Sequence, residues 1–394
     1  MDTGFNQKKK SKETAAHEEK LPRELIEEIL SRVPPKSLVR FRTVSKPWNA
    51  LFDDKTFINN HQSTFRFILK TKSKIYSVSI DPKIMVRELT LNIPGLEYQI
   101  PKDLVECGEF LLCSMDKAKG AAVWNPWLNQ TSWIKTDASH PRIQLDGIGY
   151  DSNKRVEERF YKTLWYNQDE VDDPNVWRVY DFASDAWKNI HSRSQGRDQG
   201  KKGPMSHSPS GVSLNGTLFR IVFYENVDDP LYYLMKFDFL REGFFRFCDL
   251  PCGRNHLRDA LVLRVFKGDG FSLLKQCYET KKIEVWVTKD KVNVTNGDDV
   301  VWMKFMTVSV PEVPGLVQNK TYTDPSYFID DKRLVVCFCD ENRKAWIYVL
   351  GENKLISKVQ IDSALCHRPL QHCTYFPSLV PVPRGQREDA ELQV

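Results

Sequence analysis

Cysteine and histidine residues gather at two places where they could hold a metal ion. The two groups are Cys248, Cys252 and His256, and Cys366-His367 with the nearby His372-Cys373. Structural zinc sites usually pair their ligands at C-x₂₋₄-C spacing and add a second matching pair, and neither group does so cleanly. Free cysteine in a strand or loop is more often a small buried hydrophobic residue. We therefore expect no metal site and no cofactor.

Other patterns that could do chemistry are also incomplete. Cys337 and Cys339 alternate along an expected strand, so both side chains share one face and suit a core better than a redox pair. Carboxylates at 169–173, 228–229 and 298–299 stand in polar loops, where they are ordinarily solvated turn residues. The sequence has no G-x-S-x-G, H-E-x-x-H or G-x-x-x-x-G-K-[ST] motif. We expect no catalytic residues and no enzymatic activity of the chain itself.

Composition and charge exclude further classes of function. The 394 residues are 41% hydrophobic and 12% aromatic, which indicates a packed globular body. Residues 1–60 carry 12 basic and 9 acidic side chains, and the remainder carries 45 and 43, so no basic stripe predicts nucleic-acid binding. No apolar run is long enough to span a membrane. Nine cysteines, an odd number without framework spacing, suit reduced thiols in the cytoplasm or nucleus.

Both ends of the chain are polar. Residues 1–20 lack the apolar centre of a secretory signal, and we expect a disordered basic tail there. Its lysine run from Lys8 to Lys12 either directs nuclear import or is simply solvated. We expect a second disordered tail over residues 384–394.

Residues 21–61 have the spacing of short amphipathic helices. The apolar residues of the first helix fall on one wide face: Leu25, Ile26, Ile29, Leu30 and Val33. Pro22 suits its first turn, and Pro34-Pro35 ends it. Ser37 and Ser45 are the expected N-caps of a second and a third helix. Three such helices bury too little apolar surface to be stable alone, so the segment packs on the rest of the chain or is completed by a partner.

The order of residues in this segment resembles an F-box of the large plant family. The matching positions are Leu21-Pro22, Leu25, Glu28-Ile29-Leu30, Val33-Pro34, Lys36-Ser37-Leu38, Arg40-Phe41, Val44-Ser45-Lys46 and Trp48. An ordinary three-helix core fragment would explain the apolar spacing, but not the order of Pro, Ser, Arg and Trp.

The resemblance implies a partner for this segment. In the family, the F-box docks on a Skp-type adaptor, which joins it to a cullin–RING ubiquitin ligase. The adaptor contacts that it implies here are Leu21, Pro22, Leu25, Ile29, Leu30, Val33, Leu38, Val39, Val44 and Trp48. The sequence leaves open which of them face the adaptor and which face the core of the module.

From residue 64 to 383 the pattern changes from helical to β. Short runs rich in Val, Ile, Phe, Tyr and Trp alternate with Asp, Asn, Gly and Pro turns. The expected strands include residues 74–80, 120–124, 176–182, 216–224, 232–239, 283–287, 332–338 and 345–350. A polar stretch at 191–204 fits no strand and is expected to be a long loop between blades.

A loose repeat runs through this β region. Its turn anchors are Asp81, Asn125, Asp181, Asp238, Thr288 and Gly351, spaced by 44 to 63 residues. This spacing lies near the period of about 50 residues in kelch-like propeller blades. We predict a mainly β fold: a three-helix F-box followed by a β-propeller-like domain of six or seven blades. A pair of β-sandwiches is the main rival.

The β region also resembles the F-box-associated domain of plant F-box proteins. The matching runs are Val123-Trp124-Asn125-Pro126, residues 147–151, 179–182, 184–188, 211–216, 237–239, 271–274, 283–288 and 377–380. The resemblance implies a kelch-like interaction domain that recognises substrate proteins.

Tryptophans recur through the β region. Six are at blade-like positions and are expected to fill the core: Trp124, Trp133, Trp187, Trp286, Trp302 and Trp346. Three lie nearer to loops and could line a binding face, although the core remains favoured: Trp127, Trp165 and Trp177.

These observations predict a substrate-recognition subunit of a Skp–cullin–F-box ubiquitin ligase, located in the cytoplasm or nucleus. Two alternatives stay open: a scaffold that binds the adaptor without degrading a substrate, and a propeller receptor for a glycan or small ligand. An oxidase of the kelch-like copper type is a weaker alternative because no ligand set stands out. The substrate itself is not predictable from these residues.

Overall fold

The computed structural model divides between Ser63 and Thr64 into two compact units. It describes residues 21–81, 83–93, 99–115, 120–135, 143–167, 176–191, 205–206, 211–223, 231–256, 258–311, 313–316, 325–340, 344–361 and 371–383. Several sequence predictions concern residues outside these ranges: the tails 1–20 and 384–394, most of the polar stretch 191–204, Cys366-His367, and the carboxylates at 169–173 and 228–229. Within the described ranges, no helix is both long and apolar enough to cross a membrane.

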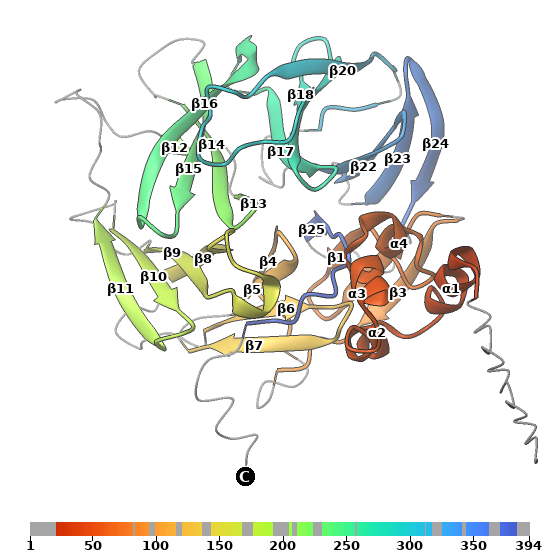
Figure 1. Cartoon of the computed structure of the whole chain (residues 1–394). Helices are drawn as coiled ribbons and strands as arrows, with labels where there is room; N and C mark the ends of the chain where they lie inside the picture. The colour runs from red at the N-terminus through yellow and green to blue at the C-terminus, as the bar shows by residue number, and fades with distance from the viewer. Residues whose placement is uncertain are drawn as a thin grey trace, which may run out of the picture. The chain divides into compact units, whose positions relative to one another are not determined.

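The first unit contains four short helices (Figure 1). They are α1 (Arg23–Leu30), α2 (Pro35–Phe41), α3 (Lys46–Asp53) and α4 (Lys55–Asn60). The prediction of three helices was wrong by one. The fourth is only six residues long and follows α3 directly, with Asp54 as its N-cap. Asp54 Oδ1 accepts the backbone N–H of Thr56 at 2.7 Å, which satisfies one of the free donors at the start of α4.

The helix caps agree only in part with the sequence. Ser45 is the N-cap of α3, as predicted, and its hydroxyl oxygen accepts the backbone N–H of Trp48. The prediction of Ser37 as the second N-cap was wrong, because α2 already begins at Pro35 and Pro34 occupies the N-cap. Proline has no N–H and a fixed φ, and both properties suit the first position of a helix.

The described residues of the second unit form six antiparallel sheets arranged in a ring, a six-bladed β-propeller (Figure 1). The first three blades contain β1 (Phe67–Lys70), β2 (Ile75–Ser79), β3 (Met85–Leu89) and β25 (Gln371–Thr374); β4 (Asp103–Cys107), β5 (Phe110–Ser114), β6 (Ala121–Asn125) and β7 (Gln130–Ile134); and β8 (Ile143–Tyr150), β9 (Tyr161–Asn167), β10 (Val176–Asp181) and β11 (Ala186–His191). A short 3₁₀ turn, η1 (Val156–Glu158), lies between β8 and β9.

The other three blades follow in chain order. They contain β12 (Met205–Ser206), β13 (Val212–Leu214), β14 (Thr217–Phe223), β15 (Leu231–Asp238) and β16 (Gly243–Arg254); β17 (Ala260–Phe266), β18 (Gly270–Gln276), β19 (Ile283–Thr288) and β20 (Trp302–Val308); and β21 (Ser326–Asp330), β22 (Arg333–Cys339), β23 (Ala345–Gly351) and β24 (Lys354–Gln360). All eight strand segments expected from the sequence coincide with strands.

The ring closes through its last strand. β25 pairs antiparallel with β1, with Phe67 opposite Thr374, so the end of the β region completes the first blade. β25 also contacts β4 of the second blade and β21 of the sixth. The predicted range of six or seven blades therefore resolves to six, because the last strand joins an existing blade instead of starting a new one.

A side chain of the second blade also holds the segment after β25. Asn125 Nδ2 donates to the carbonyl oxygens of Ser378 and Val380, both at 2.9 Å. Its Oδ1 accepts the hydroxyl of Tyr375 at 2.9 Å and the backbone N–H of Leu128 at 3.1 Å. Asn125 is fully buried, and it links the closing segment to the second blade.

The six turn anchors mark equivalent positions in the six blades. Five of them are the last residue of β6, β10, β15, β19 or β23, which is the third strand in the pairing order of its blade. The sixth, Asp81, follows β2, the third strand in the order β25-β1-β2-β3 of the first blade. The turns that follow contain residues at positive φ, including Asn129, Asp185 and Asn353, with φ between 51° and 54°. Asn and Asp tolerate this conformation better than most residues, so they are favoured in such hairpins.

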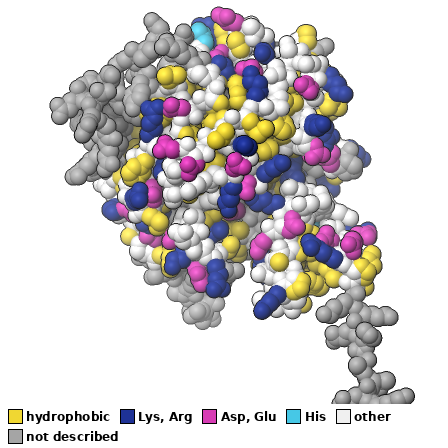
Figure 2. Space-filling view, turned by 45° about the horizontal axis from the view of Figure 1, so that its top comes forward, with side chains coloured by type: hydrophobic (Ala, Val, Ile, Leu, Met, Phe, Trp, Pro, Cys, Tyr) yellow, Lys and Arg dark blue, Asp and Glu magenta, His cyan; other side chains and the backbone are white. Residues whose placement is uncertain are grey.

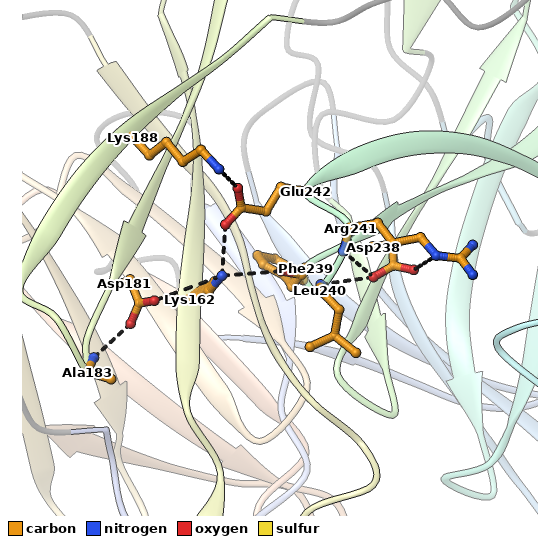
Figure 3. Close-up of polar contacts among 9 residues, drawn as sticks. All are labelled: Lys162, Asp181, Ala183, Lys188, Asp238, Phe239, Leu240, Arg241 and Glu242. Atoms are coloured by element: carbon orange, nitrogen blue, oxygen red, sulfur yellow. Dashed lines mark hydrogen bonds and ion pairs between the residues drawn. The ribbon is translucent and has the colours of Figure 1, made fainter.

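A polar cluster joins the third and fourth blades (Figure 3). Glu242, in the turn between β15 and β16, accepts a hydrogen bond from Lys162 Nζ on β9 at 2.8 Å and also pairs with Lys188 on β11. In the same turn, Asp238 Oδ1 accepts the backbone N–H of Leu240 at 2.9 Å. The hairpin is thus shaped internally and tied to two strands of the neighbouring blade.

The tryptophans pack as the core interpretation predicts. Trp124, Trp127, Trp165 and Trp286 are buried. The other five are half-buried, and four of these pack against hydrophobic clusters: Trp177, Trp187, Trp302 and Trp346. These clusters draw residues from adjacent blades, so the core of the propeller lies between the sheets.

Candidate functional site

The helical unit exposes an apolar surface. One face of α1 carries Leu25 and Ile29, which are one helical turn apart. Leu21 precedes the helix, four residues before Leu25, and Val44 lies between α2 and α3. Each of these four side chains is between 46% and 61% exposed. Figure 2 shows yellow side chains gathered on the exposed side of this unit, at the lower right. Exposed apolar residues of this unit include Leu21, Pro22, Leu25, Ile29 and Val44. We call these five the α1 surface, because most of them lie on α1 or directly before it.

The structure divides the ten predicted adaptor contacts into three groups. Five are exposed and form the α1 surface. Val33, Val39 and Trp48 are half-buried. Leu30 and Leu38 are buried, at 2% and 0% exposure, so they support the unit from inside and are not part of its exposed surface. Exposure separates the core side chains of this unit from the outward-facing ones, and contact of the outward-facing ones with an adaptor stays a prediction.

Polar contacts hold the helices that carry this surface. Arg42, at the end of α2, donates to Asn49 Oδ1 at 2.9 Å and to Asp53 Oδ1 at 2.8 Å, which ties α2 to α3. His61, after α4, reaches back to the end of α1: its Nε2 lies 2.9 Å from the carbonyl oxygen of Val33. Since His61 Nδ1 accepts the backbone N–H of Ser63, Nε2 carries the proton. Burial lowers the pKa of His61, which favours this neutral form.

The cysteine groups of the β unit pack as core residues. Cys248 and Cys252 are half-buried on β16 against a hydrophobic cluster, and burial raises the pKa of Cys248 to about 12. His256 stacks on Tyr278 with ring centroids 5.8 Å apart, and its Nδ1 accepts a backbone N–H. The described residues contain no group of three or more Cys, His, Asp or Glu side chains that could hold a metal ion.

Cys337, Cys339 and His372 also pack inside the β unit. Cys337 is fully buried in the core beside Cys339, as the core interpretation predicts. His372 on β25 makes a hydrogen-bonding contact through Nδ1 with Ser326 Oγ on β21 at 2.8 Å. Burial lowers the pKa of His372 to about 4, so this imidazole is neutral at physiological pH.

The described residues of the β unit line a hollow that the sequence did not predict. It has a volume of about 420 Å³ and lies where loops of the third, fourth and fifth blades meet. Tyr150, Arg159 and Lys291 are among its lining residues. Lys291 is more than 130 residues from Tyr150 and Arg159, and the three follow no motif, so no local pattern could have found them together.

A helical unit with an exposed apolar surface, followed by a closed propeller, defines a two-module protein. Comparison with known families supports this description. The F-box domain family matches residues 19–60, and the family of F-box-associated β-propeller domains matches residues 66–382. The chain therefore belongs to the F-box proteins that carry an F-box-associated β-propeller domain.

Two relatives align with this chain along almost its whole length. F-box protein At2g14710 of Arabidopsis thaliana is 55% identical over 381 residues, which cover 96% of this chain and 100% of the relative. F-box/kelch-repeat protein At3g16580 of the same plant is 55% identical over 391 residues, with the same coverage.

Proposed function

We propose that this protein is a substrate-recognition subunit of a Skp–cullin–F-box ubiquitin ligase. The observation that carries the proposal is the α1 surface. Exposing several large apolar side chains on so small a unit is unfavourable in water, and it suits a surface that a partner covers. A Skp-type adaptor is the partner that the F-box family implies.

In this proposal the chain contributes position and other subunits contribute the ligase chemistry. The F-box fixes the chain to the adaptor, and the propeller holds a target protein. Tethering the target turns a bimolecular encounter with the charged conjugating enzyme into an effectively unimolecular one. We expect the protein in the cytoplasm or nucleus, which fractionation of cells expressing the full chain would test.

Adaptor binding is tested by shortening the α1 surface. Truncated interface anchors often cost about 2 kcal/mol or more each. We therefore expect Leu25→Ala with Ile29→Ala to weaken binding of a plant Skp-type adaptor by well over tenfold in a titration with full-length protein. Glu24→Ala is the matched control, since Glu24 is exposed beside Leu25 and outside the surface. Equal adaptor affinity of the double variant and the parent would refute the assignment.

A substrate receptor must also differ from an inert scaffold. Affinity purification with the proteasome blocked should recover ubiquitinated proteins with the parent chain. The same proteins should be recovered without ubiquitin when Leu25 and Ile29 are both replaced by Ala. A parent chain that binds the adaptor and never increases ubiquitination of a bound protein would favour the scaffold.

A further inference from the structure

The outer strand of the fifth blade has a free edge. β20 ends the pairing order β17-β18-β19-β20, and among the described strands it pairs only with β19 (Figure 1). The carbonyl oxygen of Val301 accepts the backbone N–H of Lys289 at 2.9 Å, so Val301 turns its backbone groups towards the β19 side. In an antiparallel ladder this direction alternates from residue to residue, so Trp302 and Lys304 turn theirs outward. These outward groups can pair with a further strand.

Two apolar side chains are exposed along this edge. Val301 is 55% exposed and Met303 is 47% exposed. They are two residues apart, so both side chains point to the same face of the strand. Trp302, between them, points to the opposite face and packs against a hydrophobic cluster of the fourth and fifth blades. Residues 301–303 are therefore apolar on both faces, and the chain itself covers only one of them.

Other free edges of the propeller are better protected by charge. Natural proteins discourage pairing of exposed edge strands by placing charged side chains on them. Three other outer strands carry two exposed charged side chains each: Arg87 and Glu88 on β3, Arg246 and Asp249 on β16, and Lys354 and Lys358 on β24. β20 carries one, Lys304, and its Nζ already donates to Glu284 Oε1 at 2.7 Å.

The order of charges favours one orientation of a second strand. Asp298 is exposed shortly before this edge, and Lys304 is exposed at its other end. A second copy of the segment, lying antiparallel, brings the acidic end of each copy beside the basic end of the other. With Trp302 at the centre, Val301 lies opposite the second copy's Met303. Lys304 then lies diagonal to the second copy's Asp298, within reach of a long side chain.

We propose that this protein forms a symmetric dimer in which the β20 edges of two copies pair antiparallel. The partner is a second copy of this chain because the apolar residues and the charges of the segment complement themselves across a twofold axis. The register of β20 shifts after Lys304, so the regular free edge is short. Such a contact is smaller than a standard interface, and we expect a reversible, concentration-dependent equilibrium. The dimer goes beyond the proposed function and does not depend on it.

The test measures the mass of the full-length protein by sedimentation equilibrium over a range of concentrations. We expect the parent chain to shift from one copy to two as the concentration rises. Met303→Lys places like charges at the centre of the apolar contact and should weaken dimerisation by about tenfold or more. Ile356→Lys is the matched control, since Ile356 is 46% exposed on the outer strand β24 of another blade. It should leave the equilibrium unchanged.

An exchange of charges tests the antiparallel orientation. Asp298→Lys alone sets like charges against Lys304 of the other copy, and Lys304→Glu alone does the same against Asp298. Each variant by itself should dimerise about fivefold less tightly or worse. Mixed in equal amounts, the two variants restore both opposite-charge contacts and should associate about as tightly as the parent. Because both residues are exposed, and because a folding defect would not be repaired by mixing, this recovery reports on the contact itself.

Several outcomes would overturn the proposal: a parent chain that stays monomeric at every concentration, growth beyond two copies, unchanged dimerisation of Met303→Lys, an equal loss in Ile356→Lys, or a mixture of the charge variants that associates no better than either alone. None of these measurements involves the adaptor or a substrate. The dimer and the proposed function can therefore fail independently of each other.

Discussion

At the scale of single residues, Arg220 and Asp146 stand out because their opposite charges are both buried. Arg220 on β14 pairs with Asp146 on β8, and both side chains are less than a tenth exposed. Asp146 lies at a register irregularity between Leu145 and Gly147, where the strand departs from regular pairing. Burial lowers the pKa of Arg220 to about 10, so it remains charged at neutral pH.

This pair predicts strongly unequal effects of single and double substitutions. Arg220→Met leaves the Asp146 carboxylate buried without its partner and should cost about 3–5 kcal/mol of unfolding free energy. Arg220→Met with Asp146→Leu removes both charges and should recover most of that loss. Urea unfolding of the full-length variants measures both values. A double variant as unstable as the single one would show that the pair is needed for more than mutual neutralisation.

At the scale of elements, the hairpin between β15 and β16 depends on Glu242. Partial burial alone would raise the pKa of Glu242, but hydrogen bonds from Lys162 and Lys188 outweigh that effect and lower it. A carboxyl whose pKa is lower in the folded than in the unfolded protein stabilises the fold above its unfolded pKa of about 4.3. The stabilisation is lost as the pH falls through the lower, folded value.

Replacing Glu242 should therefore have a pH-dependent effect. Glu242→Gln keeps the shape of the side chain and should cost about 1 kcal/mol at pH 7. The difference from the parent should narrow below about pH 4, where the parent carboxyl becomes protonated as well. Thermal melts across pH 3–7 measure the difference. Glu88→Gln, at an exposed pair with Lys74, should change little throughout, and a pH-independent effect of Glu242→Gln would contradict the argument.

The closing segment after β25 depends on the hydrogen bonds of a single side chain, Asn125. Asn125→Leu would remove the hydrogen bonds that two carbonyl oxygens, a backbone N–H and the Tyr375 hydroxyl make to this side chain, at a cost of about 3 kcal/mol or more. Tyr375→Phe removes only one of these hydrogen bonds and should cost about 1 kcal/mol. Denaturant midpoints of the two variants should differ accordingly. Equal midpoints would mean that the closing segment is held by its apolar contacts alone.

At the scale of the whole molecule, the two units differ in how completely they bury their own apolar surface. The β unit pairs its last strand with its first, so its blades form a closed ring. The helical unit has four short helices and leaves its α1 surface exposed. We expect a chain of residues 64–394 to be soluble, rich in β signal by circular dichroism and cooperative in melting.

The complementary fragment should behave in the opposite way. Residues 1–63 contain too little core to offset the entropy of ordering the chain, so the fragment should be largely unstructured alone. It should gain helical signal when a Skp-type adaptor is added. A stably helical fragment on its own would contradict the argument that a partner completes this unit. Aggregation of the 64–394 chain would show that the β unit needs the helices.

Local features of this protein were predictable because they depend on neighbouring residues. The spacing of Leu25 and Ile29, the cap at Ser45 and the turns at Asn125 or Asp238 are set by helical periodicity and turn preferences within a few positions. Together they predicted short N-terminal helices, the β character and a range of six or seven blades that includes the observed six, whereas the F-box was implied by resemblance to the family. Short-range signals failed where two choices are locally equivalent, as at Ser37 and the adjoining prolines.

Only the tertiary structure decided features that join distant parts of the chain. Leu30 and Ile29 are adjacent apolar residues, and packing alone makes one buried and the other exposed. The number of blades depended on β25 pairing with β1, a contact between the two ends of the β region. Arg159 and Lys291 lie in loops of the third and the fifth blade, and only the packing of consecutive blades brings them to one hollow. Sequence periodicity reports which face of an element is apolar, whereas the position of that element against another depends on the packing of the whole chain.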